Sequence, residues 1–189
     1  MIDDTTLKNT ISVYQYYKTL GEKAMAQVED AALFHTPDEK SNSISVIVKH
    51  LNGNMLSRWT DFLTSDGEKE WRERDEEFEE TTGTREDLMK LWEEGWACLF
   101  NALHALKPED FSKTVYIRNQ GQSVLDAIMR QLAHYAYHVG QIVYLARLYN
   151  RGDWTSLTIP KGQSKTYNQE RFEKEREIKH FTDDKSVSK

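Results

Sequence analysis

The feature that most constrains this chain is a pair of histidines, His134 and His138, inside a long apolar segment. The segment from Gln131 to Gln141 has helical spacing, and at about 3.6 residues per turn both histidines lie on one side of the helix. Two neutral imidazoles that point the same way provide half of a first-row metal site, and a third ligand must come from elsewhere. Histidines also occur in cores with their ring nitrogens hydrogen-bonded to neighbours, so the pair alone leaves both interpretations open.

Hydrophobic periodicity predicts four helices, and a chain of 189 residues is long enough to bury a core as one domain. Ser43, Thr84 and Ser123 stand where capping side chains are expected before the second, third and fourth helices. The apolar positions of the four helices run through residues 7–28, 44–62, 88–106 and about 123–149. We therefore expect an all-α fold, a four-helix bundle.

An acidic segment, residues 64–82, separates the second helix from the third. Its composition predicts a solvated crossover, held to the bundle by Trp71 and Phe78. A short turn would force the two helices to be antiparallel. About twenty residues can return along the bundle, so this crossover lets the second and third helices run parallel.

The remaining segments add smaller elements. Residues 114–120 alternate like a short strand, with a turn closed by Gly121. The fourth helix is apolar around so much of its circumference that it lies at the bundle centre or meets another subunit. Residues 154–164 are expected to pack on the bundle. The predicted domains are a bundle over 1–164 and a charged tail over 165–189, disordered beyond about residue 181.

Composition excludes several functional classes. The net charge is -6 and no basic patch is present, which argues against binding to nucleic acid. Cys98 is the only cysteine, so the chain fits a reducing compartment, most simply the cytoplasm. The N-terminus lacks a basic region followed by an apolar block, and no apolar run approaches the roughly 18 residues that span a membrane. We expect a soluble protein that is not exported and does not enter a membrane.

A third histidine changes the interpretation of the first two. His50 lies at the edge of the apolar stripe of the second helix. The second and fourth helices of a four-helix bundle can face each other, so His50 can approach His134 and His138 across a cavity. Three neutral ligands that leave other positions open are typical of a catalytic metal centre. An isolated surface histidine beside Lys49 is the alternative for His50.

The sequence resembles the DinB-like superfamily of small bacterial four-helix proteins. The resemblance rests on a histidine in the second helix, the H-x-x-x-H pair in the fourth, the long crossover and the length. Three local phrases, residues 47–54, 58–67 and 132–142, point to a branch of it that is a domain of unknown function. The similarity covers about residues 5–164.

This resemblance implies an up-down-down-up bundle, homodimers, and a nickel, zinc or iron site at His50, His134 and His138. Better-studied relatives are thiol transferases that use bacillithiol, mycothiol or glutathione, and others are described as metal-dependent hydrolases. Fold and metal ligands are shared more widely than substrate. Activity is therefore the weakest expectation that the resemblance gives.

The residues and the resemblance together suggest three alternative functions. The first is a metal-dependent transferase that activates a small thiol, in which Asn54 or Gln131 orients the bound molecule. The second is a metal-dependent hydrolase, although no His-Glu-x-x-His arrangement supplies a general base. The third is a non-catalytic dimeric binding or stress-response protein. No catalytic residue other than the metal ligands is assigned from the sequence.

Overall fold

The computed structural model describes residues 4–79 and 83–183, which are mostly helical. Four helices are long, and they agree with the four that hydrophobic spacing predicts: α1 (Asp4–Met25), α3 (Ile44–Trp59), α4 (Arg85–Ala105) and α5 (Val124–Tyr149). Two shorter helices, α2 (Asp30–Phe34) and α6 (Ser164–Phe172), lie in the connection after α1 and in the tail. None of the helices in these ranges is long and apolar enough to cross a membrane.

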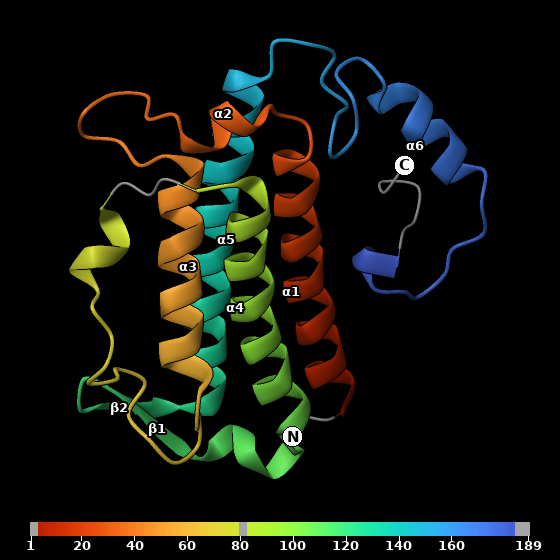
Figure 1. Cartoon of the computed structure of the whole chain (residues 1–189). Coiled ribbons are helices and arrows are strands. Elements are labelled where there is room, and N and C mark those ends of the chain that lie inside the picture. The colour runs from red at the N-terminus through yellow and green to blue at the C-terminus, as the bar shows by residue number, and fades with distance from the viewer. Residues whose placement is uncertain (1–3, 80–82, 184–189) are drawn as a thin grey trace.

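The four long helices lie side by side (Figure 1). In this view the chain rises through α1 and α5 and descends through α3 and α4, so α3 and α4 are parallel, as the length of the crossover predicts. The main contacts join α3 to α4 and α1 to α5, and α3 also packs against α5. The helix that carries His50 therefore adjoins the helix that carries His134 and His138.

A cluster of aromatic rings fills the centre between the helices. Tyr14 of α1 lies edge-on to Trp59 and Trp96, with ring centroids 6.4 and 6.5 Å apart. A polar chain crosses the same core, because Trp59 Nε1 donates to Tyr135 Oη at 3.0 Å and Tyr135 Oη donates to Asn54 Oδ1 at 3.0 Å. Satisfied buried hydrogen bonds favour one relative placement of their helices. The two hydrogen bonds therefore fix α3 against α5.

The predicted caps are confirmed at three helix starts. Ser43 Oγ accepts from Val46 N at 3.2 Å, and Ser123 Oγ accepts from Asp126 N at 3.0 Å. Thr84 and Asp87 form a reciprocal capping box at the start of α4. These caps satisfy N–H groups that have no partner within the helix.

The crossover is held differently from the sequence-based prediction. Trp71 is 56% exposed, so it does not fasten the segment to the long helices, whereas Phe78 is half-buried. The buried residues are Arg72 and Glu77, both less than 10% exposed, and Glu77 belongs to the 3-10 helix η1 (Asp75–Phe78). The prediction for Trp71 was wrong because charged residues that pair with each other took the buried positions. Residues 80–82 of the predicted crossover lie outside the described ranges.

The region before α5 is a hairpin and not a single strand. The 3-10 helix η2 (Pro108–Ser112) leads into β1 (Thr114–Ile117), which pairs antiparallel with β2 (Gln120–Ser123). Gly121 lies inside β2, so its prediction as the turn residue was wrong; the turn is formed by Arg118 and Asn119, with φ of 54° and 58°.

A distant side chain supports this turn. The Asp66 carboxylate accepts from both turn amides, Arg118 N and Asn119 N, at 2.8 Å each. These hydrogen bonds stabilise a backbone conformation that non-glycine residues rarely adopt. The contact also connects the start of the crossover to the hairpin that precedes α5.

The chain after α5 packs against the long helices. Trp154 and Leu157 pack against the core, which confirms the prediction for that segment. In the tail, Phe181 in the 3-10 helix η3 (Phe181–Asp183) meets Tyr16 of α1 with centroids 5.5 Å apart. The tail is described as far as Asp183, and residues 184–189, which make up most of the stretch predicted to be disordered, lie outside the described part.

Candidate metal centre

Three imidazoles from two helices converge at one point. His50 comes from α3, and His134 and His138 come from consecutive turns of α5. His134 Nε2 lies 3.3 Å from His50 Nε2 and 3.1 Å from His138 Nε2, and the candidate ligand atoms of all three lie within 4.8 Å of one another. The predicted approach of His50 to the pair is confirmed, and His50 is only 4% exposed, so it is not an isolated surface histidine.

Two of the three spacings between these atoms match those around one divalent metal ion. Two nitrogens bound to one ion at about 2.1 Å lie roughly 3.0 to 3.4 Å apart at right or tetrahedral angles. The two shorter Nε2 separations, 3.1 and 3.3 Å, fall within that range. Imidazole is a ligand that zinc, nickel and iron all accept, so the donor set does not choose among them.

Hydrogen bonds on the opposite ring nitrogens fix two of the three tautomers. His50 Nδ1 is 2.8 Å from Glu77 Oε2, and His138 Nδ1 is 2.7 Å from Gln141 Oε1. A carboxylate and an amide oxygen can only accept, so in the neutral rings each Nδ1 carries the proton. The Nε2 lone pairs of His50 and His138 then point toward His134. Partners of this kind typically orient metal-binding histidines.

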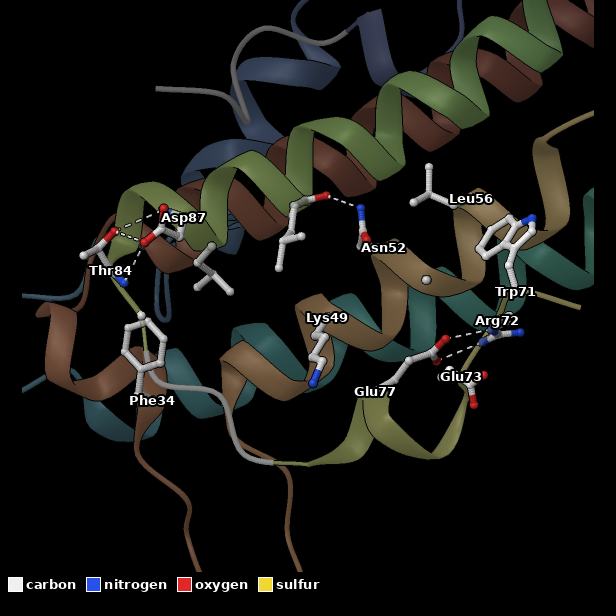
Figure 2. A pocket seen from close by; sticks show the side chains of 14 residues that line it. Phe34, Lys49, Asn52, Leu56, Trp71, Arg72, Glu73, Glu77, Thr84 and Asp87 are labelled. Atoms are coloured by element: carbon white, nitrogen blue, oxygen red, sulfur yellow. Dashed lines mark hydrogen bonds and ion pairs between the residues drawn. The ribbon is translucent and has the colours of Figure 1, made fainter. Parts of the chain in front are cut away.

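Glu77 is held by a buried arginine behind it. Arg72 Nε donates to Glu77 Oε1 at 2.7 Å and Arg72 Nη2 donates to Glu77 Oε2 at 2.9 Å, as Figure 2 shows. Burial opposes ionisation of Glu77, but the hydrogen bonds from His50 and Arg72 outweigh it, and the pKa of Glu77 is lowered. Glu77 is therefore an anion that faces His50.

The same residues form one wall of a pocket of about 400 Å³ between α3, α4 and the crossover (Figure 2). Leu56, Leu88 and Leu91 contribute apolar surface to it. Removing one member of a buried ion pair costs about 3 to 5 kcal/mol because the other is left as an uncompensated charge, so Arg72 and Glu77 depend on each other in this wall.

Burial keeps the paired histidines neutral. Desolvation, with His138 and His50 nearby, lowers the pKa of His134 to about 3. Desolvation and His50 lower the pKa of His138 to about 4, although the bond to Gln141 acts in the opposite direction. Neutral imidazole is the form that binds a metal, so both rings are ready to bind at pH 7.

Converging lone pairs repel one another unless a positive centre lies between them. In the metal-free chain, a proton on His134 Nε2 can be shared with the Nε2 atoms of His50 and His138. A divalent cation at the same point would instead accept all three lone pairs. Three histidines placed in this way could hold a metal ion.

Comparison with known proteins places the chain in a family. Residues 2–163 match the family described as protein of unknown function (DUF1572). The chain belongs to DUF1572. This confirms the expected relation to a domain of unknown function, over nearly the expected residues. No curated protein and no solved structure matches the chain.

The two residues predicted to orient a ligand in this DUF1572 protein are both buried. Asn54 is 5% exposed, and its Oδ1 accepts the hydrogen bond from Tyr135 described above. Gln131 is 4% exposed, and its Oε1 has no hydrogen-bond partner among the described residues. It lines, together with Arg58, a cavity of about 10 Å³, which is about the size of one water. A ligand-orienting role for Asn54 or Gln131 stays a prediction.

The sequence-based interpretation of this DUF1572 chain missed Arg72, Glu77 and the position of Phe78. The Phe78 ring packs on His50 with centroids 4.8 Å apart. Glu77 has no local signal, because the segment around it is acidic throughout and neither helical nor alternating in its pattern. Gln141 follows His138 by three residues, about one helical turn, and that spacing was a usable signal for a partner of His138.

The low pKa values of His134 and His138 predict how the stability of the metal-free DUF1572 chain depends on pH. His134 and His138 titrate near 6.5 when unfolded but near 3 and 4 when folded, so the unfolded chain binds more protons between these limits. The free energy of unfolding therefore falls as the pH drops from about 6.5 toward 4, by at most about 1.4 kcal/mol per pH unit for each histidine.

Urea denaturation of the metal-free wild type and of His134→Asn, at several pH values, measures this effect. The variant should lose less stability on acidification than the wild type, because one of the two protonation sites is gone. His104→Asn, at an exposed position in α4, is the control and should follow the wild type. Parallel curves for all three proteins would contradict the prediction.

Proposed function

We propose that this protein is a metal-dependent enzyme in which His50, His134 and His138 hold a divalent transition metal, nickel, zinc or iron, and in which a small thiol is the activated substrate. The observation that carries the proposal is the convergence of three Nε2 atoms, with the opposite nitrogens of two rings already engaged. A bound ion would supply Lewis acidity that favours the thiolate form of the thiol.

The charges around the site favour an anionic ligand. The two arginines that influence His134, Arg58 and Arg72, are paired with Glu68 and Glu77. Because the paired charges cancel and the histidines are neutral, the charge of a divalent ion would remain uncompensated by the protein. A thiolate is an anion with the soft donor atom that zinc and nickel accept well. In the proposed reaction the thiol loses its proton, its sulfur forms a bond to an electrophilic carbon of a second small molecule, and that carbon releases its leaving group as an anion.

The chain would bind and orient the reactants. The bond to Gln141 keeps His138 Nδ1 protonated, and Gln141 Nε2 donates to Tyr137 Oη at 3.1 Å. Tyr137 lies edge-on to His138, with centroids 4.9 Å apart, and is 63% exposed. An exposed aromatic ring beside the metal ligands offers an apolar surface to a substrate that approaches from solvent.

We also propose that the fold is an up-down-down-up four-helix bundle of the DinB-like superfamily. Its support is the parallel direction of α3 and α4 and the origin of the histidines in the second and fourth long helices. The single cysteine suits a reducing compartment, and a cytoplasmic location remains part of the proposal.

Hydrolysis is the less favoured chemistry for the same centre. It needs a general base that is free to accept a proton from water. Among the described contacts of the three histidines, the one carboxylate is Glu77, and both of its oxygens already accept hydrogen bonds from Arg72 and His50. A carboxylate held this way orients a ligand and is poorly placed to act as a base.

A specific observation favours association of two chains, with or without catalysis. Four large apolar side chains, each more than half exposed, share one face of α5: Met129, Tyr137, Tyr144 and Leu148. Their spacing of 8, 7 and 4 residues is helical, and a stripe of this kind can pack on its own copy about a twofold axis. The stripe includes Tyr137, so a homodimer formed there would border the metal centre.

The metal centre predicts one bound ion per chain. His50→Ala, His134→Ala and His138→Ala should each weaken zinc or nickel binding by more than the roughly 10- to 100-fold expected for loss of an outer hydrogen-bond partner. Elemental analysis and competitive titration measure the occupancy and the affinity. His104→Ala should bind like the wild type. Full occupancy in all three site variants would refute the metal centre.

Thiol activation predicts that turnover requires a thiol. Metal-loaded wild type should consume an electrophile such as a chlorinated nitrobenzene only when bacillithiol, mycothiol or glutathione is present, and His134→Ala should not. Product formation followed by chromatography, with ester substrates in parallel, separates the two chemistries. Ester cleavage that proceeds without any thiol would favour hydrolysis instead.

The apolar stripe predicts a homodimer in solution. Tyr144→Glu combined with Leu148→Glu should shift the protein to a monomer, because four charged side chains would be buried in the twofold interface. Sedimentation velocity measures the mass. Phe172→Glu, which changes an 86% exposed side chain on α6, is the control and should remain dimeric. A wild type that sediments as a monomer at all concentrations would contradict the prediction.

A further inference from the structure

The crossover contributes two residues that contact His50, although it contains none of the candidate metal ligands. Glu77 Oε2 accepts from His50 Nδ1 at 2.8 Å, and the adjacent Phe78 ring packs against the imidazole. Arg72, earlier in the same segment, holds the carboxylate from the other side. The crossover, which lies between α3 and α4 in the sequence, therefore holds the His50 ring in place.

The backbone of α3 leaves room for the Glu77 carboxylate beside His50. Gly53 lies one turn after His50, and a Cβ atom at Gly53 would overlap Glu77 Oε1. The carboxylate therefore passes directly over the helix backbone to reach His50, and a residue larger than glycine would push it away. Figure 2 shows Glu77 reaching from the crossover toward α3, with Arg72 beside it.

The hydrogen bond determines which nitrogen of His50 is available. An acceptor at Nδ1 places the ring proton there and leaves the Nε2 lone pair directed at His134. Without that acceptor, a neutral imidazole can carry its proton on Nε2 or rotate out of position. Either change removes one donor from the convergent set.

We propose that Glu77 is a positioning residue of the metal centre: it holds His50 in the Nδ1-protonated tautomer and aims Nε2 at the common point, with Arg72 and Gly53 fixing the place of its carboxylate. The inference rests on the proposed metal centre and adds the crossover to it. By reciprocity, a metal ion bound to His50 strengthens the attachment of the crossover to α3.

The first test uses the metal-free protein and reads the tautomer directly. Nitrogen and proton NMR of the histidine side chains should show His50 with its proton on Nδ1 in the wild type. In Glu77→Leu, which removes the acceptor, and in Gly53→Ala the Nε2-protonated form should appear. Glu76→Gln, at an exposed position in the same 3-10 helix, should keep the wild-type spectrum. A wild-type His50 protonated mainly on Nε2 would overturn the proposal.

The second test measures zinc affinity by competitive titration and the visible absorption of the cobalt-substituted protein. Glu77→Leu and Gly53→Ala should weaken zinc binding about 10- to 100-fold and change the cobalt spectrum, while Glu76→Gln should change neither. Gly53→Ala keeps every titratable group and improves helix propensity, so a loss of affinity there reports the displaced carboxylate and not a weakened helix.

The outcomes separate this inference from the proposed function. If the wild type binds zinc tightly and both variants bind it equally tightly, Glu77 has no positioning role and the three-histidine centre survives. If the wild type binds no divalent ion, both are refuted. Loss of affinity in both variants, with a folded metal-free protein by circular dichroism, supports the role assigned to Glu77.

Discussion

Three imidazole nitrogens that face one another in a partly buried space need a shared proton or a cation between them. This constraint accounts for much of the surrounding structure. His134 sits 3.1 and 3.3 Å from its two neighbours, and burial holds the pKa values of His134 and His138 far below the usual value. The rings are thus neutral donors pointing at one place. A shared proton can occupy that place in the metal-free chain, and a divalent ion fits it.

The rest of the fold keeps the two contributing helices in register. The hydrogen-bonded chain from Trp59 through Tyr135 to Asn54 connects α3 to α5 inside the core. Outside the core, the crossover bonds to His50 through Glu77, and its first residues bond to the hairpin before α5 through Asp66. Both sets of hydrogen bonds restrain α3 and α5, the first within the core and the second through the crossover and the hairpin. The long crossover therefore supports the site as well as allowing α3 and α4 to run parallel.

Elements with a regular pattern could be predicted from the sequence, and elements that depend on distant partners could not. The four long helices follow from apolar spacing, and Ser43, Thr84 and Ser123 mark their starts because capping uses local hydrogen bonds. The meeting of His50 with the histidine pair followed from bundle geometry. The hairpin turn was missed because Arg118 and Asn119 adopt positive φ only with the support of Asp66, about fifty residues earlier in the chain. Glu77 was missed for the same reason, since its burial depends on Arg72 and on the absence of a side chain at Gly53.

The central claim is that three histidines share one ion and leave room for a further ligand. X-ray absorption spectroscopy of the zinc- or nickel-loaded wild type, with and without a small thiol, tests it most directly. The account predicts scattering from three imidazoles and at least one additional light atom, with a sulfur scatterer replacing the light atom when the thiol is added. Fewer than three imidazoles, or a coordination shell that the thiol leaves unchanged, would contradict it.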